Sequence, residues 1–267
     1  MSTTVDELNF KEEDLFFFNK QGGGVIKKNF EKRNLPCHLF EERDGVYQFI
    51  IDFISSHPDI HKIAFSDGVT LYQLDLFDFI KKISSDTFSD QITDINFPLE
   101  RGKTGHYSIF GDQPMGRMNL PYDEWKAKND AWYERCRESL TADLLIISAN
   151  AITLDGEIVS IDGLGNRVSG MIFGPRHVLC IVGKNKITTN IETALNKIHN
   201  EVVPQVYIRH MMKHAASFQD VPCVKFGRCA KCFHEYSACR NEVIIRGQIK
   251  PHADRIHLLL INENLGF

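Results

Sequence analysis

The sequence predicts an α/β fold in which helices cover both faces of a mostly parallel sheet. Two observations support this prediction. Short apolar runs typical of buried strands, such as residues 177–183 (HVLCIVG), alternate with segments whose apolar residues recur at helical spacing. The chain has 267 residues and is 43% hydrophobic, which is enough to bury a large core. We therefore expect a single domain over residues 1–267.

The first part of the chain alternates helices with a strand and then enters a long loop. Helical spacing is present over residues 44–57 and again over 67–82, and residues 61–66 between them are typical of a short buried strand. Residues 97–121 are rich in Gly and Pro and lack a steady period, so they predict a loop. This loop is either a solvated insertion or a cover for an acidic ligand, with the basic residues Arg101, Lys103, His106 and Arg117.

A hairpin is the clearest element of the second part. Two β-rich runs within residues 151–161 flank Asp155-Gly156, the strongest short-range signal of a hairpin turn. The other expected elements are a helix over 122–140, strands over 142–149 and 177–183, helices from about 166 and about 190, and strands over 241–247 and 255–263.

Composition and charge argue against several classes of protein. The chain has 31 Lys and Arg residues and 35 Asp and Glu residues, and the resulting net charge of −4 gives no general attraction to nucleic acid or to an anionic membrane. No apolar run approaches the ~20 residues of a membrane-spanning helix, and the acidic first residues do not resemble a secretory signal. We expect a cytoplasmic protein with reduced cysteines, and the sequence leaves assembly into a homo-oligomer open.

Three loops follow predicted strands and are expected to meet at one edge of the sheet. Ligands of parallel α/β sheets bind at the carboxyl ends of the strands, which here lead into residues 66–70, 150–167 and 183–186. Glycines in the second loop allow backbone N–H groups to approach an anion, and Arg167 supplies positive charge. The alternative is that these glycines only permit a tight turn. The candidate ligand-binding residues are Ser66, Asp67, Gly68, Thr70, Asn150, Asp155, Gly163, Gly165, Asn166, Arg167 and Lys184.

The second loop also contains the clustered carboxylates that acid/base chemistry would need. Asp155 is expected to serve its turn, which leaves Glu157 and Asp162 as candidate catalytic residues. Asp162 directly precedes a glycine and is better placed than Glu157 to reach a pocket. In the first loop, Asp67 would repel a phosphate and is expected to cap the following helix. No companion motif demands proton transfer, so the sequence leaves catalysis open.

Four cysteines near the C-terminus are a second chemical signal. Cys223, Cys229, Cys232 and Cys239 follow the pattern Cys-x5-Cys-x2-Cys-x6-Cys, which is close to the spacings that hold iron–sulfur clusters. One Cys-x-x-Cys pair with irregular outer gaps is weaker than the spacings that mark a metal site. We therefore expect the segment 223–239 to pack as small apolar thiols without a bound metal.

Four stretches of the chain resemble the lactate-utilisation (LUD) domain family. The longest, residues 142–187, contains the hairpin, the glycines and Arg167. Residues 65–82 resemble that family's glycine-rich loop and helix, residues 222–245 its C-terminal cysteine segment, and residues 259–267 its usual ending. The resemblance therefore covers the chain from about residue 20 onward.

The resemblance implies a three-layer α/β sandwich similar to the superfamily of sugar-phosphate isomerases and CoA transferases. It also implies a role in the utilisation of lactate or a related 2-hydroxy acid, with a pocket for a small carboxylate or phosphate and with iron–sulfur clusters on partner subunits. It assigns no cofactor to this chain. Because fold and family do not fix the chemistry, two alternatives stay open. The first is a stand-alone sugar-phosphate-type isomerase or acyl/CoA transferase, and the second is a non-catalytic partner subunit.

Overall fold

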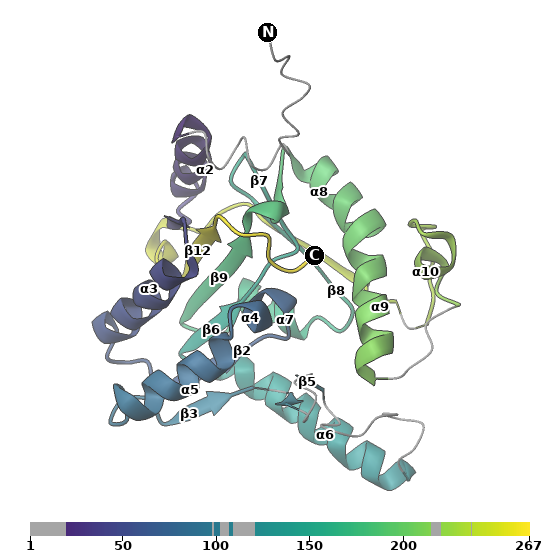
Figure 1. Cartoon of the computed structure of the whole chain (residues 1–267), viewed down its shortest axis with the longest axis horizontal. Coiled ribbons are helices and arrows are strands. Elements are labelled where there is room, and N and C mark those ends of the chain that lie inside the picture. The colour runs from purple at the N-terminus through teal and green to yellow at the C-terminus, as the bar shows by residue number, and fades with distance from the viewer. Residues whose placement is uncertain (1–19, 98, 102–106, 109–120, 215–219, 236) are drawn as a thin grey trace, which may run out of the picture.

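The computed structural model describes residues 20–97, 99–101, 107–108, 121–214, 220–235 and 237–267 (Figure 1). Within these residues, a six-stranded sheet with the strand order β1-β12-β9-β6-β2-β3 forms the centre of the fold. All neighbouring strands of this sheet run parallel. The strands are β1 (Cys37–Phe40), β2 (Lys62–Phe65), β3 (Asp94–Asn96), β6 (Leu144–Ile147), β9 (His177–Gly183) and β12 (Ile256–Ile261).

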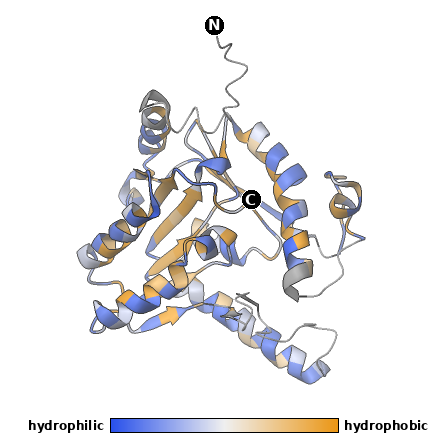
Figure 2. Cartoon of the chain, in the orientation of Figure 1, coloured by the Kyte–Doolittle hydropathy of each residue, from blue (hydrophilic) through white to orange (hydrophobic). Residues whose placement is uncertain are grey.

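Helices cover both faces of this sheet because its strands are apolar on both sides. Successive residues of a strand point to opposite faces, and in β6 Leu144 and Ile146 join one buried cluster while Leu145 and Ile147 join the other. Figure 2 shows the central strands hydrophobic along their length, whereas the helices alternate between hydrophobic and hydrophilic residues. The helices are α3 (Arg43–Ser56) and α5 (Leu76–Asp86) on one face and α2 (Lys20–Lys32) and α7 (Asn166–Ile172) on the other.

A second, smaller sheet contains the expected hairpin. Among the described residues its strand order is β10-β7-β8-β11, and β7 and β8 pair antiparallel around a turn in which Gly156 has a φ of 86°. The helices α8 and α9 pack on its outer face, joined by a π-helical segment. The bounds are β7 (Ala151–Thr153), β8 (Ile158–Asp162), β10 (Ile187–Thr188), β11 (Asn241–Ile245), α8 (Ile191–Lys197), the π-helical segment (Ile198–Val202), α9 (Val203–His214) and α10 (Pro222–Phe226).

The predicted fold class is confirmed, because the chain forms a three-layer α/β sandwich around a parallel sheet. The prediction of one continuous helix over residues 67–82 is wrong. The structure divides it into α4 (Val69–Gln73) and α5, and Asp75 between them has a φ of 46°, which an α-helix does not accommodate. The spacing of apolar residues continues across this break, so periodicity alone did not reveal it.

The long loop expected over residues 97–121 lies mostly outside the described residues, as do Lys103, His106 and Arg117. Two short strands, β4 (Glu100–Arg101) and β5 (Tyr107–Ser108), pair antiparallel within it. The helix α6 (Tyr122–Glu138) follows, close to its expected bounds. In the part of the chain that the structure describes, no helix has the length and apolar character needed to cross a membrane.

Candidate functional site

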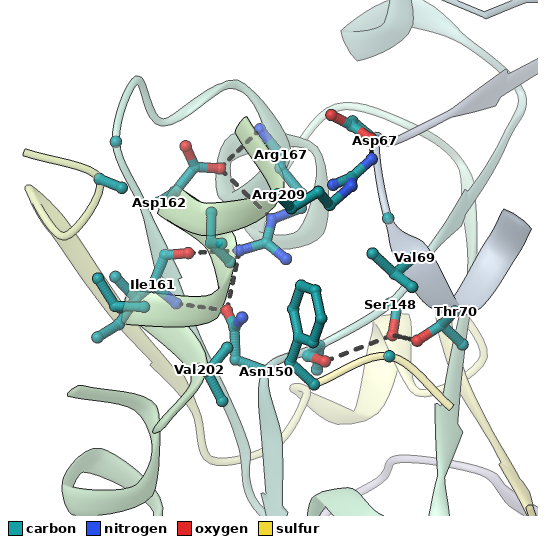
Figure 3. A pocket seen from close by; sticks show the side chains of 18 of the residues that line it. Asp67, Val69, Thr70, Ser148, Asn150, Ile161, Asp162, Arg167, Val202 and Arg209 are labelled. Carbon is teal, nitrogen blue, oxygen red and sulfur yellow. Dashed lines mark hydrogen bonds and ion pairs between the residues drawn. The ribbon is translucent and has the colours of Figure 1, made fainter. Parts of the chain in front are cut away.

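A cavity of about 290 Å³ lies at the carboxyl ends of four neighbouring strands of the central sheet. The loops after β2, β6 and β9 supply Asp67, Ser148 and Lys186, and the tail after β12 supplies Phe267. Parallel sheets expose their loops at this edge, so residues far apart in the sequence meet there. The loop after β8 and the helix α9 close the remaining sides (Figure 3).

Lys186 is the most deeply buried charged group of the cavity. Lys186 is the last residue of a short 3-10 turn (Lys184–Lys186) that follows β9, and it is 4% exposed. The Nζ atom donates to Thr70 Oγ1 at 2.9 Å, to Ser148 Oγ at 2.9 Å and to the carbonyl oxygen of Ala149 at 2.8 Å. Burial, assisted by the nearby guanidinium of Arg167, lowers the pKa of Lys186 to about 7.

Arg167 and Asp162 form the second group of the cavity, at the start of α7. Asp162 Oδ1 accepts from the backbone N–H groups of Leu164 and Gly165 just before α7 at 3.1 and 3.0 Å, and Oδ2 accepts from the backbone N–H of Arg167 in the first turn of the helix at 3.2 Å. The same Oδ2 atom lies 3.6 Å from Arg167 Nε. The Nη2 atom of Arg167 donates to Asn150 Oδ1 at 2.9 Å and to the carbonyl oxygen of Ile161. Figure 3 shows these side chains together on one side of the cavity.

Asp67 and Arg209 form the third group. Arg209 of α9 donates to Asp67 Oδ1 at 2.7 Å, and the hydroxyl of Tyr72 donates to the same oxygen at 2.5 Å. Burial and the Asp67 carboxylate raise the pKa of Tyr72. The expectation that Asp67 is the cap residue of α4 is wrong, because Gly68 occupies the N-cap position. Asp67 instead ties the first loop to α9, and its charge is balanced by Arg209.

Two of the cations in the cavity are paired with carboxylates, whereas Lys186 is not. Asp162 is paired with Arg167, and Asp67 is paired with Arg209. Among the described residues, no carboxylate lies within ion-pair distance of Lys186, whose hydrogen-bond partners are two hydroxyls and a carbonyl. A buried cation with only neutral partners favours the entry of an anion, because the anion would offset the cost of burying the charge.

The structure brings most of the sequence-predicted residues to this cavity. Those that line it are Asp67, Gly68, Thr70, Asn150, Asp162, Gly163, Asn166 and Arg167. Those that do not line it are Ser66, Asp155, Glu157, Gly165 and Lys184. Gly165 lies next to the cavity as the N-cap residue of α7, and Asp155 is exposed at the hairpin tip.

The predicted loop 183–186 includes Lys186, although Lys184 was the lysine named as a candidate. Sequence reasoning missed several other lining residues, of which the most polar or largest are Ser148, Arg209, His210, Trp132 and Phe267. Ser148 directly precedes a loop that the sequence did single out, so its position after a buried strand was a usable signal. Arg209 offered none, because it lies on a helix 142 residues after its partner Asp67.

Glu157, a candidate catalytic residue, lies outside the cavity and is paired with two arginines. The residue is 3% exposed, and its Oε1 atom lies 2.8 Å from Arg246 Nη1 and 3.6 Å from Arg33 Nη2. These two ion pairs connect the hairpin to the residue that follows α2 and to the residue that follows β11. We expect Glu157→Gln to lower the free energy of unfolding by about 1–3 kcal/mol, because a buried charged hydrogen bond is weakened. Urea unfolding measures this loss, and unchanged stability together with lost ligand binding would contradict it.

The four cysteines of the segment 223–239 do not line the cavity, although Ala238 of the same segment does. Cys223 is buried, and Cys229, Cys232 and Cys239 are half-buried. Burial, together with the three neighbouring thiols, raises the pKa of the Cys223 thiol to about 11, so the four cysteines lie near one another. Within the described ranges, no three His, Cys, Asp or Glu side chains are arranged to hold a metal ion. That the segment binds no metal in solution stays a prediction.

Comparisons with known proteins found a matching family and a similar solved structure. The model of the LUD domain family matches residues 24–261. Among solved structures, a DUF162 family protein from Deinococcus radiodurans is similar at 11% sequence identity and a TM-score of 0.29, over 83% of this chain and 99% of that chain. No curated protein matches the sequence.

Proposed function

The chain belongs to the LUD domain family, and on that premise we propose that its cavity binds a small carboxylate or phosphate in the metabolism of lactate or a related 2-hydroxy acid. We also propose that the protein is cytoplasmic and that it acts together with iron–sulfur partner subunits, as the family resemblance implies. One observation carries the ligand assignment: Lys186 is buried in the cavity with no carboxylate partner among the described residues.

The size and polarity of the cavity support a small ligand. About 290 Å³ lies at the lower limit of the pockets that bind drug-sized molecules, so lactate, pyruvate or inorganic phosphate would fit better than a nucleotide. Arg167 has one guanidinium nitrogen, Nη1, that donates to no described residue. A carboxylate or phosphate could accept from this nitrogen, and from Lys186 by taking the place of one of its three present acceptors, which would give two charge-assisted hydrogen bonds.

We expect Lys186→Met to weaken binding of such an anion about ten- to hundredfold, because a hydrogen bond to a charged group contributes about 1.5–3 kcal/mol. Thermal shift titrations with L-lactate, pyruvate and inorganic phosphate measure this, since a ligand that binds only the folded state raises the melting temperature. Melting of each variant without ligand separates lost binding from lost folding.

The neighbouring lysine provides a matched control for this experiment. Lys184 lies two residues earlier and does not line the cavity, so Lys184→Met is expected to bind the anion as the wild type does. Loss of binding in Lys184→Met but not in Lys186→Met would contradict the assignment. A melting shift with phosphorylated sugars but none with L-lactate would favour the isomerase alternative. No shift with any of these ligands would favour the non-catalytic partner subunit.

A further inference from the structure

Ser148 and Lys186 form a hydrogen-bonded pair inside the cavity. The Nζ atom of Lys186 lies 2.9 Å from Ser148 Oγ, and both residues line the same cavity. The serine directly follows β6 and is 4% exposed. A buried serine hydroxyl next to an amine is the arrangement of enzymes in which lysine replaces histidine as the base that activates a nucleophilic serine.

The surroundings of Lys186 favour a base. A lysine beside a carboxylate would keep its proton, whereas the three partners of Lys186 are uncharged. Burial and Arg167 lower the pKa of Lys186 to about 7, so a large share of the molecules has a neutral amine with a free electron pair at neutral pH. In that form the 2.9 Å hydrogen bond reverses, and Ser148 Oγ, which donates to Thr70 when Lys186 is charged, donates to Lys186 Nζ. General bases work best when their pKa lies near the working pH.

Ser148 is better suited than Thr70 to act as the nucleophile. Thr70 is 1% exposed, and a Cβ atom added to Gly266 would lie only 2.7 Å from Thr70 Oγ1, so the C-terminal tail covers this hydroxyl. Thr70 Oγ1 also accepts from Ser148 Oγ at 3.2 Å and from Lys186, which holds both groups in place. Thr70 is therefore a positioning residue.

We propose that Ser148, with Lys186 as its base, takes an acyl group from a short acyl phosphate bound in the cavity. This inference rests on the proposed function, because the phosphoryl group would occupy the anion site. The class of substrate follows from the cavity. Its cations favour a phosphoryl group, and its volume of about 290 Å³ favours a short acyl chain.

The reaction transfers the acyl group without any further reactant except water. Ser148 Oγ attacks the carbonyl carbon while its proton moves to Lys186 Nζ, and the bond between the carbonyl carbon and the phosphate oxygen breaks. Phosphate leaves with the electron pair of that bond and takes the proton from Lys186. Water then attacks the serine ester, its proton passes through Lys186 to Ser148 Oγ, and the carboxylic acid leaves. The sum is acyl phosphate plus water giving carboxylic acid plus phosphate.

Acetyl phosphate is a direct probe of this inference. The full chain is incubated with acetyl phosphate and quenched in acid, and its peptides are then examined by mass spectrometry. We expect one acetyl group on Ser148 that alkaline hydroxylamine removes, because alkaline hydroxylamine cleaves oxygen esters but not amides. Ser148→Ala and Lys186→Met are expected to lose this label. Ser148→Cys is expected to be acetylated in its place, as a thioester, which guards against a variant that fails to fold.

A matched control uses a buried serine without a lysine partner among the described residues. Ser84 of α5 is 7% exposed and lies outside the cavity, so Ser84→Ala is expected to be labelled like the wild type. A full Ser148 label in folded Lys186→Met would overturn the role of the base. An acetyl group on Lys186 that resists hydroxylamine would show that the amine itself reacts, which also overturns the inference.

The failure of this inference is distinguishable from failure of the proposed function. If inorganic phosphate raises the melting temperature but Ser148 is never acetylated, the acyl transfer is wrong and the anion site stands. If phosphate, lactate and pyruvate all fail to shift melting and Ser148 is still acetylated, the anion site is wrong. In that case the proposed function falls, whereas the transfer of an acyl group to Ser148 stands.

Discussion

Replacement of Gly156 by alanine is expected to lower the free energy of unfolding by about 2–5 kcal/mol. Gly156 forms the tip of the β7–β8 hairpin with a φ of 86°, which costs a residue with a side chain about 1–2 kcal/mol. A Cβ atom there would lie 2.6 Å from the carbonyl carbon of Asn29 and 2.8 Å from the backbone nitrogen of Phe30. Both atoms belong to the backbone of α2, so the helix or the hairpin must shift.

Gly227→Ala separates the cost of backbone strain from the cost of this close contact. Gly227 also has a positive φ, 66°, but a Cβ atom there meets nothing within 4 Å. We expect a loss of only about 1 kcal/mol at Gly227, because strain alone acts there. Urea unfolding of both variants measures the two losses. Equal small losses at the two positions would mean that α2 does not pack against the hairpin as the structure shows.

The same hairpin shows how much of the fold and the site could be predicted from the sequence. Asp155-Gly156 predicted the turn because few residues adopt the backbone angles of a tight hairpin. The position of the site followed from a general property of parallel sheets, since loops after neighbouring strands must meet at one edge. Neither inference needed long-range contacts, because both depend on local backbone geometry and on the direction of the strands.

The identity of the buried lysine could not be predicted in this way. Lys184 and Lys186 lie in one short loop, and the 3-10 turn that they form determines which side chain enters the cavity. No apolar period extends through such a turn, so the sequence pattern does not distinguish the two. Arg209 was missed for another reason, because its position depends on how α9 packs beside the first loop. The ion pairs of Glu157 could not be predicted either, because a buried carboxylate between two arginines has the same local sequence as a catalytic one.

A cluster of histidines at the opposite edge of the sheet makes stability depend on pH. The ring of Phe53 is surrounded by those of His57, His177 and His257. The distances from its centroid to the three histidine centroids range from 4.2 to 5.5 Å. His38 lies beside His257, with His38 Nε2 and His257 Nδ1 3.2 Å apart. Burial, assisted by the neighbouring His38, lowers the pKa of His257 to about 4. Burial also lowers the pKa of His38 and of His177.

Stability is therefore expected to fall as the pH decreases from about 6.5 to about 4. The unfolded chain binds a proton at His257 near pH 6.5, whereas the folded chain takes it up only near pH 4, so acid favours the unfolded state over this range. The contribution of His257 is complete above about pH 6.5. Its loss amounts to about 3 kcal/mol, because each tenfold difference in proton affinity between the folded and unfolded chain corresponds to about 1.4 kcal/mol.

The hydrogen bonds of His257 give the physical reason for this loss. Its Nε2 atom lies 3.0 Å from the carbonyl oxygen of Asp254, which can only accept, so Nδ1 accepts from His38 in the neutral ring. A second proton on His257 would turn Nδ1 into a donor that faces another donor. Urea unfolding at about pH 7, pH 5.5 and pH 4.5 tests this, with His257→Gln expected to lose about 3 kcal/mol less than the wild type between the first and last of these. An equal loss in the two proteins would mean that carboxylates elsewhere in the chain, and not His257, determine the acid sensitivity.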